Sequence, residues 1–197
     1  FEYGFSVPNG YAISKKVLEL YVIEKSFPDG FKQSLESCLV VLNAQKIIIR
    51  SSAIGEDSDS FSFAGQLDSF VVQNNMEAAL EAILKCWDGL RNDRVIAYEK
   101  LSGKRLVKMG VVIQEFVEAD YAGVTFTSSP YHIDQIYTEY VKGAGEQLVS
   151  GKVTPKNFTV NFRETPKEKL PFNGVELIRL ATTLKENYGY HIDIEWV

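Results

Sequence analysis

Residues 47–53 read Ile-Ile-Ile-Arg-Ser-Ser-Ala, and this stretch predicts more about the chain than any other. Its three β-branched isoleucines are typical of a buried strand. Arg50, Ser51 and Ser52 follow, so the strand would carry a fixed positive charge and two hydroxyls into the polar loop that comes next. Such groups can bind a polyphosphate. Taken alone, however, this triplet is more often an ordinary strand end with a surface arginine.

The composition is that of a globular protein large enough to bury a core. The chain has 197 residues, of which 45% are hydrophobic and 24% are charged. Its formal net charge of -5 argues against a nucleic-acid partner, because such proteins usually present a basic face. No apolar stretch approaches the roughly 20 residues of a membrane span and no signal peptide is visible, so we expect a cytoplasmic protein without a membrane partner.

Cysteine and histidine usage gives no signal for a disulfide or a zinc site. Cys38 and Cys86 lie in helix-like apolar surroundings, which predicts two buried free thiols. His132 and His191 are far apart in the sequence, and there is no Cys-x-x-Cys.

Hydrophobic periodicity predicts a mixed α+β chain. Helices are expected over residues 15–26, 32–43, 76–101 and 175–188. Strands are expected over residues 46–50, 67–72, 110–116, 123–127, 135–141, 157–161 and 191–196. We therefore expect a single domain over 1–197, with a helix-rich lobe near 1–108 and a sheet-rich lobe near 109–197.

Eight short motifs occur along the chain. They are Gly-Phe-Ser-Val-Pro-Asn-Gly at 4–10, Arg-Ser-Ser-Ala at 50–53, Glu-Asp at 56–57, Phe-Ala-Gly-Gln at 63–66, Val-Val-Ile-Gln-Glu-Phe-Val at 111–117, Ala-Gly-Val-Thr-Phe-Thr-Ser-Ser-Pro at 122–130, the run Gly-Ala-Gly-Glu-Gln-Leu-Val-Ser-Gly-Lys-Val-Thr-Pro at 143–155 and Asp-Ile-Glu-Trp at 193–196. Each is weak alone, but their shared order is specific. In this order the chain resembles the ATP-binding domain of the pyruvate phosphate dikinase and phosphoenolpyruvate synthase family, which includes rifampicin phosphotransferases.

The resemblance implies an ATP-grasp-like, two-lobed fold with ATP in a cleft between the lobes. It assigns Arg50 to the β- and γ-phosphates, which a guanidinium suits by its fixed charge and its fork of donors. Gly65 would let a loop backbone approach the phosphates closely. Ser51, Ser52 and Gln66 are further candidates for phosphate contact.

The resemblance also assigns the adenine edge to the end of one strand. Glu115, Phe116 and Val117 would contact the base through backbone groups, with the Glu115 carboxylate near the N6 amine and Gln114 beside them. A flat apolar base with a donor–acceptor edge suits a strand end between apolar walls.

Asp193 and Glu195 are the expected metal ligands. Their i, i+2 spacing places both carboxylates on one face of a strand. Paired carboxylates suit Mg²⁺, which is usually held by carboxylate and phosphate oxygens together. Two solvated acidic side chains are the alternative interpretation, and the resemblance favours the metal role, for Glu195 most of all.

Two flanking motifs of the family are absent from this sequence. The family carries Gly-Gly-Lys before the first motif and Gln-x-Arg after Asp-Ile-Glu-Trp. The chain starts at Phe1, which is not Met, and stops at Val197. We therefore expect a domain truncated at both ends and inactive as an isolated fragment.

The implied function is that of the Mg·ATP-binding domain of a dikinase-type phosphotransferase, an enzyme with kinase activity. ATP would pass its β-phosphoryl group to a histidine on a separate domain, in the same longer chain or in a partner chain, leaving AMP and phosphate. An acceptor-binding domain would then transfer it to pyruvate or an antibiotic hydroxyl. The alternative is a divergent or truncated module that binds nucleotide in a regulatory role without catalysis.

Overall fold

The computed structural model describes residues 4–53, 57–58, 61–62, 67–102, 108–130, 132–145 and 153–197. The chain forms two compact units. The contiguous unit is Pro8–Phe116, and the split unit combines Phe1–Val7 with Val117–Val197. Both contain helices and an antiparallel sheet, so the predicted α+β class is confirmed.

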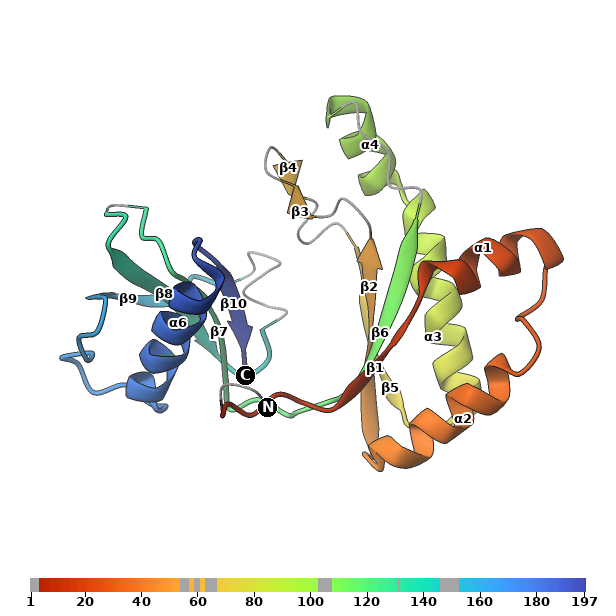
Figure 1. Ribbon diagram of the computed structural model, residues 1–197, viewed down its shortest axis with the longest axis horizontal. Helices are drawn as coiled ribbons and strands as arrows, with labels where there is room; N and C mark the ends of the chain where they lie inside the picture. Colours follow the sequence, from red (N-terminus) through yellow and green to blue (C-terminus); the bar gives the residue numbers. More distant parts are fainter. Residues whose placement is uncertain are drawn as a thin grey trace. The chain divides into compact units, whose positions relative to one another are not determined.

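A four-stranded sheet with the order β1-β6-β2-β5 forms the centre of the contiguous unit. Its strands are β1 (Gly10–Ile13), β2 (Lys46–Ala53), β5 (Ser69–Gln73) and β6 (Met109–Glu115). One face is covered by three helices, α1 (Lys15–Glu24), α2 (Phe31–Leu42) and α3 (Met76–Asp88) (Figure 1). The remaining elements are β3 (Asp57–Ser58), β4 (Phe61–Ser62), η1 (Gly89–Arg91) and α4 (Asp93–Ser102).

Alternation along the strands builds the core of this unit. Ile47 and Ile49 of β2 are fully buried against the helices, together with Val111 and Ile113 of β6. Ile83 of α3 meets them from the helical layer. Because strand side chains alternate between faces, the even-numbered residues of β2 lie on the face opposite the helices.

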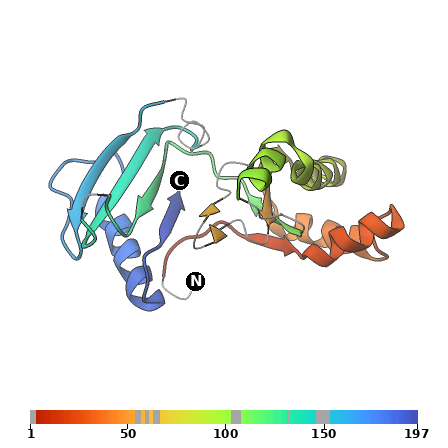
Figure 2. The same ribbon diagram turned by 90° about the horizontal axis from the view of Figure 1, so that it is seen from above.

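The split unit has one sheet and one helix. The strand order is β10-β7-β8-β9, and the elements are β7 (Tyr121–Phe126), β8 (Gln135–Lys142), β9 (Lys156–Asn161), β10 (Asp193–Trp196) and α6 (Gly174–Tyr188). Helix α6 packs on one face of the sheet (Figures 1 and 2). The core between them contains Ile136, Tyr140, Phe158, Ile178 and Ala181.

Hydrogen bonds fix β10 to the rest of this sheet. The indole Nε1 of Trp196 donates to Thr125 Oγ1 at 3.0 Å, and the hydroxyls of Thr125 and Thr138 are also 3.0 Å apart. Both threonines are fully buried, so each satisfies the other's polar group inside the core. Gly123 lies opposite Trp196, and a Cβ at this position would collide with the indole ring.

The expected helix over 76–101 is wrong in one respect, because the structure divides it. Helix α3 ends at Asp88, a short 3₁₀ turn follows, and α4 begins at Asp93. Asn92 causes the break: its backbone is extended, with φ -70° and ψ 155°, and its Oδ1 accepts from Val95 N–H at 2.7 Å. An extended asparagine that bonds the third residue ahead starts a new helix.

The two units also divide the chain differently from the lobes expected near 1–108 and 109–197. Strand β6 follows residue 108, yet it pairs with β2 and β1 of the contiguous unit. The segment before Pro8 belongs to the split unit. Pairing between distant strands determines both assignments, and local sequence patterns do not report it.

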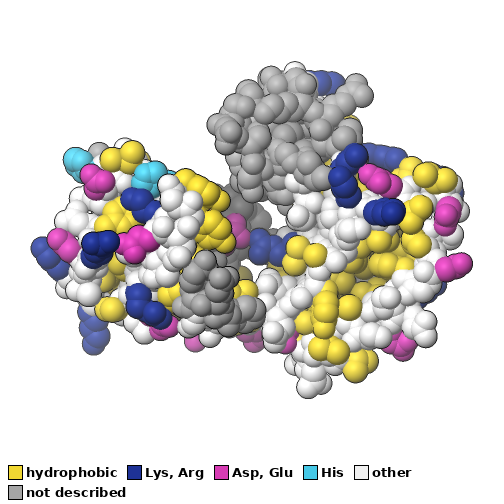
Figure 3. Space-filling model, in the orientation of Figure 1, with side chains coloured by type: hydrophobic (Ala, Val, Ile, Leu, Met, Phe, Trp, Pro, Cys, Tyr) yellow, Lys and Arg dark blue, Asp and Glu magenta, His cyan; other side chains and the backbone are white. Residues whose placement is uncertain are grey.

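Among the described residues, no helix combines the length and the apolar character that crossing a membrane would require. Basic and acidic side chains are interspersed over the visible surface in Figure 3.

Candidate functional site

Strand β10 presents two carboxylates on one face. Asp193 and Glu195 are exposed, whereas Ile194 and Trp196, which alternate with them along the strand, pack into the core against α6. The alternation predicted for these residues is therefore present. Their carboxylates point to the face of the sheet opposite α6.

The strand register extends this face across the sheet. Asp193 lies opposite Phe126 of β7, and Phe126 lies opposite Tyr137 of β8. In the next row, Glu195 lies opposite Val124, which in turn faces Glu139. Glu139 is not among the site residues that the sequence predicts. Its position two residues after Tyr137 indicates a shared face, but its place in the row of Glu195 depends on the register.

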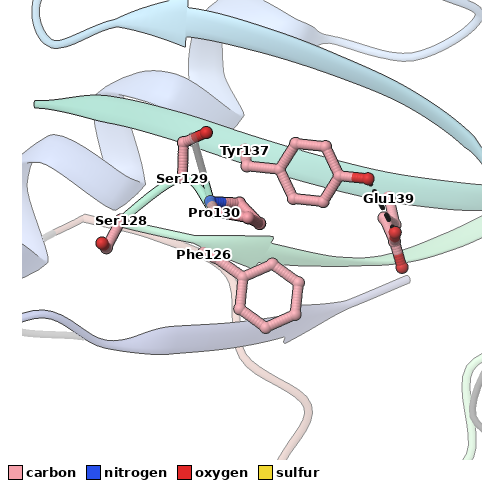
Figure 4. Close-up of a pocket in the computed structure, with 6 residues that line it drawn as sticks. All are labelled: Phe126, Ser128, Ser129, Pro130, Tyr137 and Glu139. Atoms are coloured by element: carbon pink, nitrogen blue, oxygen red, sulfur yellow. Dashed lines mark hydrogen bonds between the residues drawn. The ribbon is translucent and has the colours of Figure 1, made fainter. Parts of the chain in front are cut away.

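A shallow pocket of about 350 Å³ opens on the same face. Its lining comes from the end of β7, the residues after it and the facing part of β8: Phe126, Ser128, Ser129, Pro130, Tyr137 and Glu139 (Figure 4). The rings of Phe126 and Tyr137 stack with centroids 6.1 Å apart and an interplanar angle of 26°. The Tyr137 hydroxyl donates to Glu139 Oε1 at 2.7 Å, which fixes that carboxylate beside the aromatic pair.

In the contiguous unit, the structure separates the members of the Arg-Ser-Ser triplet. Arg50 is half-buried and lies on the face opposite the helices, between Val112 of β6 and Ser69 of β5. Ser52 shares this face and is exposed. Ser51 lies on the helical side, where its hydroxyl donates to the Asp68 carbonyl at 3.2 Å. Ser51 therefore makes a structural contact, and its assignment to phosphate stays a prediction.

Gly65 and Gln66, the other predicted phosphate contacts, lie outside the described residues.

The predicted adenine edge coincides with a well-bonded strand end. The N–H of Glu115 donates to the Asn9 carbonyl at 2.9 Å, and the N–H of Phe116 donates to the Lys46 carbonyl at 3.2 Å. Gln114 Nε2 donates to the Pro8 carbonyl at 3.1 Å. These bonds fix the strand end to the segment before β1 and to the start of β2.

The predicted contact residues at this strand end belong to different faces and units. Gln114 lies on the same face as Arg50, and the side chain of Glu115 alternates to the other face. Val117 is exposed and is the first residue of the later part of the split unit.

The acidic residues of β10 fit a magnesium ion that is also bound by other groups. Among the residues that the structure describes, no group of three or more His, Cys, Asp or Glu side chains could hold a metal ion by itself. Mg²⁺ is usually held by one or two carboxylates together with phosphate oxygens and water. Two exposed carboxylates on one strand face meet that requirement.

The chain belongs to the family described as "Pyruvate phosphate dikinase, AMP/ATP-binding domain", which it matches over residues 5–173. The match includes Arg50 and the strand end at 114–117, and it ends before Asp193 and Glu195.

Its relatives include phosphotransferases of several kinds. The chain is 29% identical over 99% of its length to the "Uncharacterized phosphotransferase YvkC" of Bacillus subtilis, of which the match covers 30%. It is 32% identical over 75% of its length to a rifampicin phosphotransferase of a Streptomyces species, covering 21% of that protein. With a probable phosphoenolpyruvate synthase of Methanothermobacter thermautotrophicus it shares 41% identity over 58% of its length and 17% of that protein. The chain thus spans less than a third of these relatives.

Proposed function

We propose that this chain is the Mg·ATP-binding part of a dikinase-type phosphotransferase. The observation that carries the proposal is the exposed pair Asp193 and Glu195 in a chain of an AMP/ATP-binding family. Both side chains lie on one face of β10, and the other face of this strand packs into the core. ATP is the nucleotide expected from the family, and Mg²⁺ would be bound by the paired carboxylates together with phosphate oxygens.

Each residue has a distinct chemical role in this proposal. Arg50 would neutralise phosphate oxygens by bidentate, charge-assisted hydrogen bonds. Asp193 and Glu195 would hold the magnesium ion, which supplies positive charge to the phosphates when bound. The protein would contribute position and charge, because phosphoryl transfer requires little covalent chemistry from the nucleotide-binding part.

The complete reaction would require residues outside this chain. The β-phosphoryl group of ATP would pass to a histidine on a separate domain, with AMP as the leaving group and the γ-phosphate released to water as inorganic phosphate. The phosphoryl group would then pass from the histidine to a small-molecule acceptor, such as pyruvate or an antibiotic hydroxyl. Relatives three or more times as long as the matched region leave room for such domains. The cytoplasmic location remains a prediction from the sequence.

Calorimetric titration of ATP into the chain, with Mg²⁺ and with EDTA, tests the nucleotide site. We expect Mg²⁺-dependent binding, weakened roughly tenfold or more by Arg50→Ala, since a charge-assisted contact to phosphate is lost. Glu195→Ala should abolish most of the difference between the Mg²⁺ and EDTA titrations.

Arg163→Ala and Glu186→Ala are matched controls. They remove an exposed Arg–Glu pair, 2.7 Å apart, on the split unit. Exposed pairs contribute little to stability, so both control variants should bind ATP as the unaltered chain does. A folded chain that binds no ATP, or Arg50 and Glu195 variants that bind normally, would contradict the proposal.

A second experiment distinguishes catalysis from the regulatory alternative. The chain would be mixed with γ- or β-labelled ATP and a phosphohistidine domain from a relative. Label from the β-position on histidine supports the phosphotransferase function. ATP binding without such transfer supports a nucleotide-binding module without catalysis.

A further inference from the structure

We propose that Asn9 positions the Glu115 carboxylate so that the nucleotide site selects adenine over guanine. The inference rests on the proposed ATP-binding function and adds a residue that determines base specificity. Asn9 is a positioning residue here, because it would act through Glu115.

Three hydrogen bonds join these two residues. The backbone N–H of Asn9 donates to Glu115 Oε2 at 3.2 Å, and Asn9 Nδ2 donates to Oε1 at 3.2 Å. In return, the N–H of Glu115 donates to the Asn9 carbonyl at 2.9 Å. Each carboxylate oxygen therefore has its own donor from the same residue. Rotation of the carboxylate would break at least one of these bonds, so its orientation is fixed.

The backbone around Asn9 is held close to β6 as well. Pro8 accepts a hydrogen bond from Gln114 Nε2, and Gly10 pairs with Gln114 at the start of the β1–β6 ladder. A Cβ at residue 10 would lie only 2.8 Å from the Ile113 carbonyl oxygen. Glycine at this position therefore permits the close approach that brings Asn9 to Glu115.

A fixed carboxylate distinguishes the two purines by their exocyclic groups. An ionised carboxylate only accepts hydrogen bonds, and its two oxygens have about four acceptor positions. After both bonds from Asn9, acceptor positions remain for the N6 amine of adenine. Guanine has a carbonyl oxygen at that place, which a carboxylate would repel. Because Asn9 already fixes the Glu115 carboxylate, this carboxylate loses less conformational entropy when adenine binds, which increases the preference for adenine.

Titration of ATP and of GTP into Asn9→Ala, each with Mg²⁺, tests the inference. We expect the affinity for ATP to fall by about 3- to 10-fold, which is less than the loss of a direct hydrogen bond to a charged group, because Asn9 acts on the base only through Glu115. The affinity for GTP should stay the same, so the preference for ATP falls by the same factor. The affinity of Asn9→Ala for adenosine, which lacks phosphates, should fall by the same factor. Arg50→Ala should leave the affinity for adenosine unchanged.

Asn161→Ala is the matched control. Asn161 Nδ2 donates to the exposed Glu164 carboxylate at 3.1 Å, so the variant removes the same kind of bond from the split unit. It should leave the ATP-to-GTP ratio unchanged.

Two results would overturn the inference alone, in a chain that binds ATP. One is an unchanged ATP affinity in Asn9→Ala, and the other is an equal loss for ATP and GTP, which would indicate general loosening. Failure of the unaltered, folded chain to bind ATP would overturn the proposed function and the inference together.

Discussion

The thiol of Cys86 shows how strongly burial acts on a single group. Cys86 is buried on α3, with its Sγ 3.8 Å from the Ile49 carbonyl oxygen and 4.0 Å from that of Asp68. Burial, and to a lesser extent the negative charge of Asp68, raise the pKa of this thiol from 9.0 to about 12. The thiolate is disfavoured there, so Cys86 is an inert core residue rather than a nucleophile.

This shift predicts a pH dependence of stability. In the unfolded chain the thiol loses its proton near its ordinary pKa, whereas in the folded chain it keeps the proton until about pH 12. The free energy of unfolding should therefore be insensitive to this group below pH 9 and should fall between pH 9 and 12. Urea denaturation at several pH values measures the effect.

Comparison of variants isolates the contribution of Cys86 from that of other groups. Cys86→Ala should remove part of the downward slope above pH 9, whereas Cys38→Ala, at a partly exposed position, serves as control. Equal slopes in the unaltered chain and in Cys86→Ala would show that the two states of the protein do not differ in this titration.

At the scale of elements, the helix starts differ in how their first N–H groups are bonded. Asn75 has extended backbone angles, φ -143° and ψ 161°, and its side chain accepts from the Ala78 N–H at 2.9 Å at the start of α3. Ser14 occupies the corresponding position before α1 and is described without a side-chain capping bond. Both helices thus begin at residue types that favour helix starts, but only α3 is capped by a side-chain hydrogen bond.

We expect unequal effects when these two caps are removed. Asn75→Ala should lower the free energy of unfolding by about 1 kcal/mol, since an N–H of the first turn loses its acceptor. Ser14→Ala should lower the free energy of unfolding much less. Chemical denaturation of both variants provides the measurement, and similar losses for the two would contradict this account.

The elements predicted from local patterns agree with the structure wherever a local signal determines them. The run Ile47–Ile49 is a strand because its β-branched residues suit a buried sheet, and α6 follows its hydrophobic period. The break before α4 was also encoded locally, by Asn92 as a cap, and the long hydrophobic period concealed it.

The contents of the candidate site were less accessible from sequence. The common face of Asp193 and Glu195 follows from alternation in one strand. That Glu139 and the aromatic pair lie on the same face follows only from the register between strands. The bond from Asn9 to Glu115 joins residues near the two sequence ends of the contiguous unit. Such contacts depend on which strands pair, and that choice is made by packing of the whole sheet.

At the scale of the whole molecule, the main feature is that one unit is continuous in sequence and the other is not. Residues 8–116 form the contiguous unit, and the split unit needs the segment before Pro8. Phe5 is buried there with 9% of its surface exposed, and the guanidinium carbon of Arg179 lies 4.4 Å from its ring centroid. The N-terminal segment thus packs against α6 through Phe5.

Fragments should reflect this division. Residues 8–116 should fold alone with a cooperative thermal transition. Residues 117–197 should be less stable than the same fragment joined through a short glycine linker to residues 1–7, by about 1 to 3 kcal/mol, the value of burying one phenylalanine. Circular dichroism melting of the three fragments gives the comparison. Phe5→Ala in the joined fragment should remove the gain, and equal stability with and without residues 1–7 would refute the assignment.

The discontinuity also sets an order of events during translation. Every residue of the contiguous unit leaves the ribosome before Val117, so that unit can complete its sheet while the rest is still being made. Phe5 emerges earlier still, but its cation–π partner Arg179, on α6, is synthesised after the contiguous unit. The segment before Pro8 is therefore made earlier than the contiguous unit, yet it reaches its native neighbours only after that unit has been made.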